Sequence, residues 1–302
     1  MSFTLILAVL LDLWLGEPKR LHPLVVFGSI ANSVEAQLRN LNHSVLRQKL
    51  AGCFALLLML VPLIGLVFFL SHWYLVNIIF APVILYLCIA PDSLKEHAFA
   101  VLNALEEDDL LLARRQVAMI VSRETDHMNE LDVRKATIES VLENGADAVF
   151  APIFWFVVAG PAGVVMYRLS NTLDAMWGYK NVRYKNFGWA AARFDDVLNW
   201  IPARLTAVTY ALLGKFSIAI CCWKNQAHHL DSPNAGPVMT SGAGALNIQL
   251  GGPACYHGKM KQKIFFGSDV PVVNNDIRRA IQLIYSSLYC WIIILVLGEI
   301  LA

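Results

Sequence analysis

The sequence predicts an all-α polytopic membrane protein: a helical membrane bundle with re-entrant or broken segments and long cytoplasmic helical and loop segments. Of its 302 residues, 57% are hydrophobic and only 16% are charged, whereas a soluble globular domain is nearer 25% charged. Several apolar runs reach the length of about 20 residues that crosses a bilayer as a helix. Two other apolar runs are interrupted by glycine, proline or charged residues.

The charge balance and the cysteines exclude other classes of protein. The net charge is +1, so no overall basic field attracts nucleic acid, and we expect no nucleic-acid partner. None of the six cysteines belongs to a C-x-x-C pair, which favours small buried hydrophobic residues over a disulfide framework. No pair of histidines has convincing metal spacing with a carboxylate, so we expect no zinc site.

The chain is expected to form one membrane-integral domain over residues 1–302. Its first apolar run lacks a basic start and a small-residue cleavage site. We therefore interpret this run as a retained membrane helix, interrupted by Asp12, rather than as a signal peptide. The candidate membrane segments are residues 2–16, 50–70, 73–90, 148–167, 197–222 and 280–301.

Four long polar segments lie between the apolar runs, and each carries five or six lysines and arginines. The positive-inside rule places all four segments in the cytoplasm. The last of them is too long for a simple connection and is expected to be a binding loop. These polar segments are residues 17–49, 91–147, 168–196 and 223–279.

This common orientation conflicts with single crossings at 148–167 and 197–222, because either crossing would place its flanks in opposite compartments. The favoured solution is a hairpin that turns at Gly160-Pro161 and returns the chain to the side it left. Non-helical backbone at membrane depth is tolerated when it is buried in protein or lines a cavity. The alternative is that both runs span and the charge rule misleads, since long loops obey it poorly.

A helix is expected from about Asp132 to Gly145, at the entry to an apolar run. Glu139, Glu143 and Asp147 are spaced four residues apart, so they share one face if helicity survives the glycine. Like charges at this spacing repel, and burying a bare charge is costly. A cation such as Mg²⁺, an arginine or a bound amine would relieve both effects, whereas the alternative is a solvated acidic face.

The stretch RLSNTLDAMWGYKNVRYKNFG (168–188) combines acidic and basic residues. Asn171 and Asp174 are three residues apart and project together from a helix, and the cations Lys180, Arg183 and Lys185 follow. A carboxylate beside clustered cations suits a metal–phosphate ligand, because the acid holds Mg²⁺ and the cations hold phosphate oxygens. The alternative is a juxtamembrane basic loop attracted to anionic lipid.

The stretch ARFDDVLNWIPARL (192–205) places Asp195 and Asp196 beside Arg193 at the mouth of an apolar run. If a helix begins near Arg193, the helix dipole favours an acid in its first turn. That explanation accounts for one aspartate but not for the pair, nor for Arg204 deeper in the run, which needs a partner. The competing interpretation is that these residues form a functional site.

The stretch DSPNAGPVMTSGAGALNIQLGGPACYHG (231–258) is rich in glycine. It is no Walker A loop, because no G-K-[S/T] closes it. Small residues let backbone approach a ligand closely, and successive N–H groups can form an anion nest. The alternative is a surface loop punctuated by glycine and proline.

Taken together and in this order, these segments resemble the membrane-bound adenosylcobinamide-phosphate synthases of cobalamin biosynthesis, the CobD/CbiB family. The resemblance covers nearly the whole chain. The motifs that carry it are IVSRETD (120–126), ESVLEN (139–144), NTLDAMWGYK (171–180), ARFDDVLNWIPARL (192–205), and SPN-x-G followed by AGALNIQLGGP (243–253).

The resemblance implies an amide-forming carbon–nitrogen ligase. Such enzymes join a propionate of adenosylcobyric acid to (R)-1-aminopropan-2-ol or its O-phosphate, with ATP as co-substrate and Mg²⁺ as cofactor. The product would be adenosylcobinamide or its phosphate, formed through an acyl phosphate. The resemblance also implies a bacterial cytoplasmic (inner) membrane location with an active site facing the cytoplasm, and makes other cobalamin-assembly enzymes candidate partners beside the lipid bilayer.

Roles for individual residues follow from this chemistry as hypotheses. Carboxylates suit the metal of Mg²⁺-ATP, and we expect Asp174, Asp195 and Asp196 to hold it. Glu143, Asp174 and Asp196 are the candidate catalytic residues, with Glu143 facing the amine or a second metal. The residues expected to bind the nucleotide and its phosphates are Arg123, Asn171, Lys180, Arg193, Ser232 and Asn234.

Two other classes of function compete with the ligase. A non-catalytic membrane sensor or regulatory protein would not require the whole acidic and basic set. A small-molecule transporter would use Arg204, Lys215 and the broken 148–167 run along its path. Against a transporter, the polar motifs concentrate outside the clean spans, and the chain has no symmetric halves.

Overall fold

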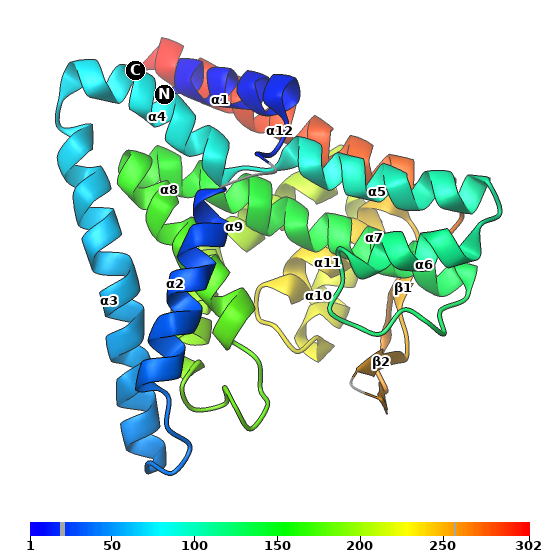
Figure 1. Cartoon of the computed structure of the whole chain (residues 1–302). Coiled ribbons are helices and arrows are strands. Elements are labelled where there is room, and N and C mark those ends of the chain that lie inside the picture. The colour runs from blue at the N-terminus through cyan, green and yellow to red at the C-terminus, as the bar shows by residue number, and fades with distance from the viewer. Residues whose placement is uncertain (19–21, 257) are drawn as a thin grey trace. The chain divides into compact units, whose positions relative to one another are not determined.

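The computed structural model describes residues 1–18, 22–256 and 258–302, and the chain divides into two compact units. Unit 1 comprises Met1–Ala90 and Ala151–Asn199, and unit 2 comprises Pro91–Phe150 and Trp200–Ala302. Helices dominate both units (Figure 1), so the all-α class is confirmed. Within the described chain, four helices are long and apolar enough to cross a membrane: Val45–Ser71, Val76–Glu106, Glu130–Trp177 and Asn275–Leu301.

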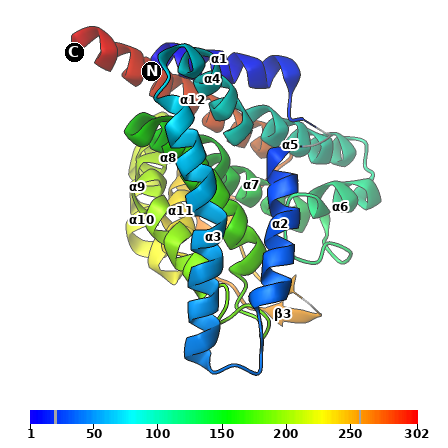
Figure 2. The same ribbon diagram turned by 60° about the vertical axis from the view of Figure 1, so that its left-hand side comes forward.

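Unit 1 is built around two long helices that run antiparallel and side by side, α2 and α3 (Figure 2). Both pack on α8, and the shared core buries Phe27, Leu56, Leu173 and Trp177. The α3 helix has 27 residues, about 40 Å at 1.5 Å per residue, which exceeds the thickness of a bilayer core. The helices of unit 1 are α1 (Ser2–Leu15), α2 (Pro23–Leu38), α3 (Val45–Ser71), α4 (Tyr74–Cys88), α8 (Ala151–Trp177) and the first part of α9 (Trp189–Leu213).

The α8 segment is broken at Gly160, as the sequence predicted. Gly160 has φ 61° and ψ −154°, a region open almost only to glycine. The chain folds back there: a Cβ placed on Gly163 would lie 2.4 Å from the carbonyl oxygen of Trp155. Ala151 and Tyr167 belong to one core cluster, although a straight helix would hold them about 24 Å apart. The break that the sequence predicts at Gly160-Pro161 is therefore present, and the return of the chain to the side of the membrane it left stays a prediction.

Unit 2 places α7 against α5 and α6 (Figure 1) and also against α11 and α12. Two small antiparallel sheets follow α11, with β1 pairing with β4 and β2 with β3. Its elements are α5 (Pro91–Glu106), α6 (Leu110–Ala118), α7 (Glu130–Gly145), a π-helix (Ala146–Phe150), the rest of α9, α10 (Phe216–Gln226), a 3₁₀ turn (Ala227–His229), α11 (Ala235–Leu246), β1 (Gln249–Gly251), β2 (Ala254–Tyr256), β3 (Lys259–Lys261), β4 (Phe265–Gly267) and α12 (Asn275–Leu301).

The 223–279 segment, which was expected to be a binding loop, is not one long loop, because it contains the end of α10, α11 and four short strands. Several of its residues line a cavity, so a binding role for the segment stays a prediction. Residues 235–246 form α11, and every one except Ala235 is buried. Its small residues permit close packing: a Cβ on Gly242 would lie 2.7 Å from Leu142, and one on Gly244 would lie 2.7 Å from Ala219. Small residues at helix contacts are typical of helices that pack in membranes, so the glycines serve packing here.

The 197–222 run is also broken, as its composition suggested. The α9 helix ends at Leu213 and α10 begins at Phe216. Between them, the backbone N–H of Lys215 donates to the carbonyl oxygen of Ala245 at 2.9 Å. A Cβ on Gly214 would lie 2.5 Å from the side chain of Ala245, so the break is fixed by a close contact with α11.

Candidate functional site

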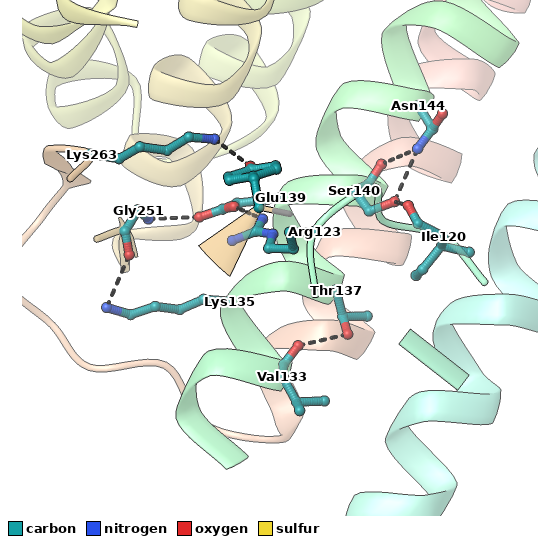
Figure 3. Close-up of polar contacts among 11 residues, drawn as sticks. Ile120, Arg123, Val133, Lys135, Thr137, Glu139, Ser140, Asn144, Gly251 and Lys263 are labelled. Carbon is teal, nitrogen blue, oxygen red and sulfur yellow. Dashed lines mark hydrogen bonds and ion pairs between the residues drawn. The ribbon is translucent and has the colours of Figure 1, made fainter. Parts of the chain in front are cut away.

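Unit 2 contains a cavity of about 340 Å³ that is lined by both polar and apolar side chains. One wall is α7, and another is the connection between α6 and α7, which carries Arg123. Gly251 of β1 and Lys263 of the connection between β3 and β4 also line it (Figure 3), as does Tyr256 of β2. Small-molecule sites span about 300–1,000 Å³, so this cavity has the size of a site for a compact ligand.

Glu139 holds three elements of this cavity together. Its side chain is 6% exposed and forms an ion pair with Arg123. Its other oxygen accepts a hydrogen bond from the backbone N–H of Gly251 at 2.7 Å. Lys135, one turn earlier on α7, reaches the carbonyl of the same glycine at 3.5 Å (Figure 3). The buried carboxylate therefore ties α7, the Arg123 segment and β1 into one wall.

Arg123 lines the cavity as expected, but its guanidinium already has a carboxylate partner. Burial alone would lower the pKa of Arg123, and the adjacent Glu139 carboxylate outweighs that effect and raises the pKa. The residue stays charged, and the donors that Glu139 does not use remain for a ligand.

Glu143 follows Glu139 by one turn of α7 and is exposed to the cavity. Asp147, the third acid of the predicted face, does not line the cavity. A π-helix begins at Ala146, one residue before Asp147. Its wider turn changes the helical period, so Asp147 no longer follows the four-residue spacing of Glu139 and Glu143. The sequence therefore grouped Glu139 with Glu143 correctly and placed Asp147 wrongly.

Ser232 and Asn234 stand at the start of α11 and have local partners. The Ser232 hydroxyl lines the cavity and accepts from the backbone N–H groups of Asn234 and Ala235 at 3.2 and 3.1 Å. Asn234 is buried, and its side-chain oxygen accepts from Arg204 at 3.2 Å. Arg204 also lies 4.2 Å from the ring centroid of Trp200. Arg204 thus contacts an amide, backbone carbonyls and an aromatic ring.

Unit 1 brings together the other predicted acids. Asp195 is 7% exposed and accepts from the side-chain amides of Asn199 at 3.0 Å and Asn171 at 3.4 Å. Burial raises the pKa of Asp195 to about 7, and the neighbouring Asp174 carboxylate adds to the rise. The hydroxyl of Tyr167 donates to Asn199 at 3.0 Å, which orients the amide that faces Asp195.

The adjacent Asp196 has a different environment. Its side chain is 29% exposed and pairs with Arg193 at 2.9 Å. The α9 helix begins at Trp189 rather than near Arg193, so both aspartates lie in its second turn. A helix dipole acts mainly within the first turn, and the dipole explanation for this pair is therefore wrong.

Lys180 was expected to face phosphate but lies exposed on the 178–188 connection. That connection is anchored through Arg183, which donates to Glu35 of α2 at 3.0 and 2.8 Å. Glu35 is 1% exposed and also pairs with Arg39. This anchor was not predicted, because Glu35 and Arg183 are 148 residues apart and nothing in the local sequence links them.

The acids around Asp195 are the residues of unit 1 to test as magnesium ligands. In the part of the chain that the structure describes, no three His, Cys, Asp or Glu side chains form a ready-made metal site. Magnesium in nucleotide sites is commonly held by one or two carboxylates, with phosphate oxygens and water completing its shell. Asp195, buried beside another carboxylate, offers such a position.

Comparison with known proteins gives a consistent result. A sequence model described as "CobD/Cbib protein" matches residues 5–284. The "Cobalamin biosynthesis protein CobD" of Chromobacterium violaceum is 51% identical over 288 residues, covering 94% of this chain and 92% of the relative. Proteins of the same name from Stutzerimonas stutzeri and Clostridium perfringens are 50% and 33% identical, and cover 96% and 90% of this chain and 95% and 91% of their own lengths. No solved structure matches the chain.

Proposed function

Because the chain belongs to the CobD/Cbib family of cobalamin biosynthesis, we propose that it is an ATP-dependent amide ligase of that pathway. The reaction joins a propionate side chain of adenosylcobyric acid to (R)-1-aminopropan-2-ol or its O-phosphate. The product is adenosylcobinamide or its phosphate.

A carboxylate is a poor acyl donor until it is activated. Transfer of the γ-phosphoryl group of ATP to the propionate oxygen gives an acyl phosphate and ADP. The amine then attacks the acyl carbon, so that a C–N bond forms as the C–O bond to phosphate breaks. The nitrogen must lose a proton in this step, and a positioned base accelerates such a transfer.

One observation carries the proposal: Asp195 is buried beside Asp174, with Asp196 next to it. Like-charged carboxylates in a buried site are costly unless a cation joins them. Asp174, Asp195 and Asp196 would hold Mg²⁺-ATP, and the ion would offset the negative charge of the phosphates. Asn171 orients Asp195 through its amide, and Arg193 and Lys180 supply cations for phosphate oxygens.

The cavity of unit 2 provides groups for the amine. Glu143 faces the cavity and would accept the proton that the nitrogen loses. Arg123 and Ser232 line the same space and would contact the polar end of the substrate, and Asn234 holds the start of α11 through its bond to Arg204. A single ligation assay tests the roles of both groups of residues.

The membrane location follows the same reasoning. The chain is a membrane protein with four candidate spans within its described residues, and we place it in the bacterial cytoplasmic membrane with its polar segments in the cytoplasm. The corrinoid, the amine and ATP are its substrates, and other cobalamin-assembly enzymes are candidate partners. Cysteine labelling from each side of sealed vesicles, at positions in 168–196 and 223–279, should mark both segments from the cytoplasmic side.

The test is incubation of the purified protein with adenosylcobyric acid, aminopropanol phosphate and Mg²⁺-ATP, with mass spectrometry of the corrinoid. Amide product and nucleotide turnover are expected. Asp196→Asn, at a partly exposed position, should lose activity by about 100-fold while inserting normally, and Asp269→Asn, at an exposed acid elsewhere, should retain it. Absence of both product and turnover would sink the ligase, and substrate flux across vesicles without turnover would favour a transporter.

A further inference from the structure

The cavity of unit 2 contains one unmatched pair of opposite charges. Six of its lining side chains are charged at neutral pH. Arg123 pairs with Glu139, and Lys261 pairs with Asp231. The two that remain, Glu143 and Lys263, have no ion pair with any residue that the structure describes.

Lys263 is the basic residue of the two, and it lines the cavity. Its ammonium donates to the hydroxyl of Tyr256 at 2.7 Å and lies 4.9 Å from the centroid of that ring (Figure 3). A phenol hydroxyl is neutral, so this contact orients the ammonium without cancelling its charge. Two of its three N–H donors remain for a ligand.

Glu143 is the matching anion on the opposite element, helix α7. The neighbouring amide of Asn144 donates to the carbonyl and hydroxyl of Ser140 at 2.9 and 3.0 Å, so it is not turned toward Glu143. Glu139, one turn away, is occupied by Arg123 and Gly251. No residue that the structure describes donates a hydrogen bond to the Glu143 carboxylate, so both of its oxygens face the cavity as acceptors.

The cavity size restricts what these two charges can bind. At about 340 Å³, the space lies at the small end of the range for ligand sites. A compact molecule with one ammonium and one anionic group would satisfy both charges at once. Such a ligand is an amino alcohol esterified with phosphate, since a phosphate monoester carries about −1.5 to −2 charges at pH 7.

We infer that Lys263 and Glu143 are the specificity-determining residues of this cavity, and that Lys263 selects the phosphorylated amine over the free amino alcohol. This inference rests on the proposed ligase for the identity of the amine. It goes beyond that function in assigning recognition of the phosphate of the amine to Lys263 and recognition of its ammonium to Glu143. Lys263 contacts the phosphate and Glu143 contacts the ammonium.

The experiment measures binding without chemistry, on full-length protein in detergent micelles, by calorimetry with no ATP or corrinoid present. The probes are (R)-1-aminopropan-2-ol O-phosphate, (R)-1-aminopropan-2-ol and isopropyl phosphate, which lacks the amine. Lys263→Gln should weaken the phosphorylated amine by about 10- to 100-fold, the usual effect of a charged hydrogen bond. It should leave the weak affinity for the free amine within about twofold.

Glu143→Gln should show the complementary pattern, weakening both amines and leaving isopropyl phosphate unchanged. The matched controls are Lys259→Gln in the same group of strands and Glu107→Gln after α5, both exposed and outside the cavity. Both controls should bind as the unmodified protein does.

Three results would overturn the inference: no binding of the phosphorylated amine by the unmodified protein, no loss in Lys263→Gln, or equal loss for both amines. The binding readout also separates this inference from the proposed ligase. If Lys263→Gln and Glu143→Gln show these complementary losses of affinity but the ligation assay gives no amide product, only the proposed ligase is contradicted. If amide product forms but the two variants do not show complementary losses, only the inference is contradicted.

Discussion

In unit 1 the buried carboxylate of Asp195 lies near a second carboxylate, whereas in unit 2 the buried carboxylate of Glu139 pairs with a cation at the wall of a cavity. In unit 1, Asp195 is buried beside Asp174, and its hydrogen bonds come from neutral amides. In unit 2, the buried Glu139 has a guanidinium and a backbone N–H as partners. Each arrangement uses acids on long helices, but the partners differ.

This difference indicates which kind of ligand each region would bind. An acidic group that the protein supplies with amides alone is stabilised by an added cation, so unit 1 is suited to a metal-bound anion. A cavity whose charges are already balanced, apart from one opposite pair, is suited to a ligand that carries both charges. The predictions below test this division, beginning with the largest expected effect.

The ion pair at Glu139 should be the most costly feature to remove. Glu139→Ala leaves Arg123 in a mostly buried position without its carboxylate, and breaking such a pair costs about 3–5 kcal/mol. Glu139→Gln keeps an acceptor for Gly251 and should lose less. Thermal unfolding in detergent measures both variants, and a Glu139→Ala protein as stable as the parent would contradict the balanced description of unit 2.

Magnesium with a non-hydrolysable ATP analogue should stabilise the protein through unit 1. A ligand at 100 times its Kd adds about 2.7 kcal/mol to the free energy of unfolding. Asp195→Asn should lose most of this increment, whereas Glu143→Gln in unit 2 and Asp269→Asn at the surface should keep it. If Asp195→Asn and Glu143→Gln lost it equally, the division between the two regions would fail.

The fold-back at Gly160 should matter for unit 1 in particular, because the second half of α8 carries Asn171 and Asp174. Gly160→Ala places a side chain at a positive φ and should destabilise the protein by about 2 kcal/mol. Gly65→Ala in α3 is the matched control, since its added Cβ meets no atom within 4 Å and alanine favours a helix. Gly160→Ala should weaken the nucleotide analogue more than the amine, and the reverse order would break the comparison.

The anchor at Glu35 should give the smallest effect, and it depends on pH. Burial opposes ionisation of Glu35, but hydrogen bonds from Arg183 and Arg39 outweigh it and lower the pKa of the carboxyl. A lowered folded pKa means that the anchor is fully formed above the ordinary pKa of about 4.3 and is lost as the pH falls through the folded value.

Glu35→Gln should therefore cost about 1 kcal/mol at neutral pH, since Arg183 is half exposed. The loss should shrink as the pH falls below about 4, which melting temperatures across a pH series would show. Glu106→Gln removes an exposed pair with Arg278 in unit 2 and serves as control. An unchanged loss at low pH would argue against an ionic anchor.

The sequence predicted the features that depend on local patterns. The helix expected from about Asp132 to Gly145 is α7 (Glu130–Gly145), whose start is fixed locally by a capping box between Asn129 and Asp132. The break at Gly160-Pro161 was predictable for the same reason. The helical class followed from hydrophobic runs of membrane length, which leave few alternatives in a bilayer.

The features that the sequence did not predict depend on distant contacts. The α11 helix contains three glycines, which are poor helix formers in isolation, and α7 and α10 pack against it. The partners of Glu139 lie 16 residues before it and 112 after it. Lys263 follows two other lysines, Lys259 and Lys261, in the sequence. Its contact with the hydroxyl of Tyr256 distinguishes it from them, and that contact is visible only in the structure.

The division of the chain has a consequence for its synthesis. Unit 1 combines Met1–Ala90 with Ala151–Asn199, so its first four helices leave the ribosome before the segment that completes their core. At about 5–20 residues per second, Asn199 follows Ala90 after roughly 5–20 s. During that interval the faces of α2 and α3 that later cover Leu173 and Trp177 have no partner from their own unit. A chaperone or the insertion machinery has its longest opportunity to act on the nascent chain in that window.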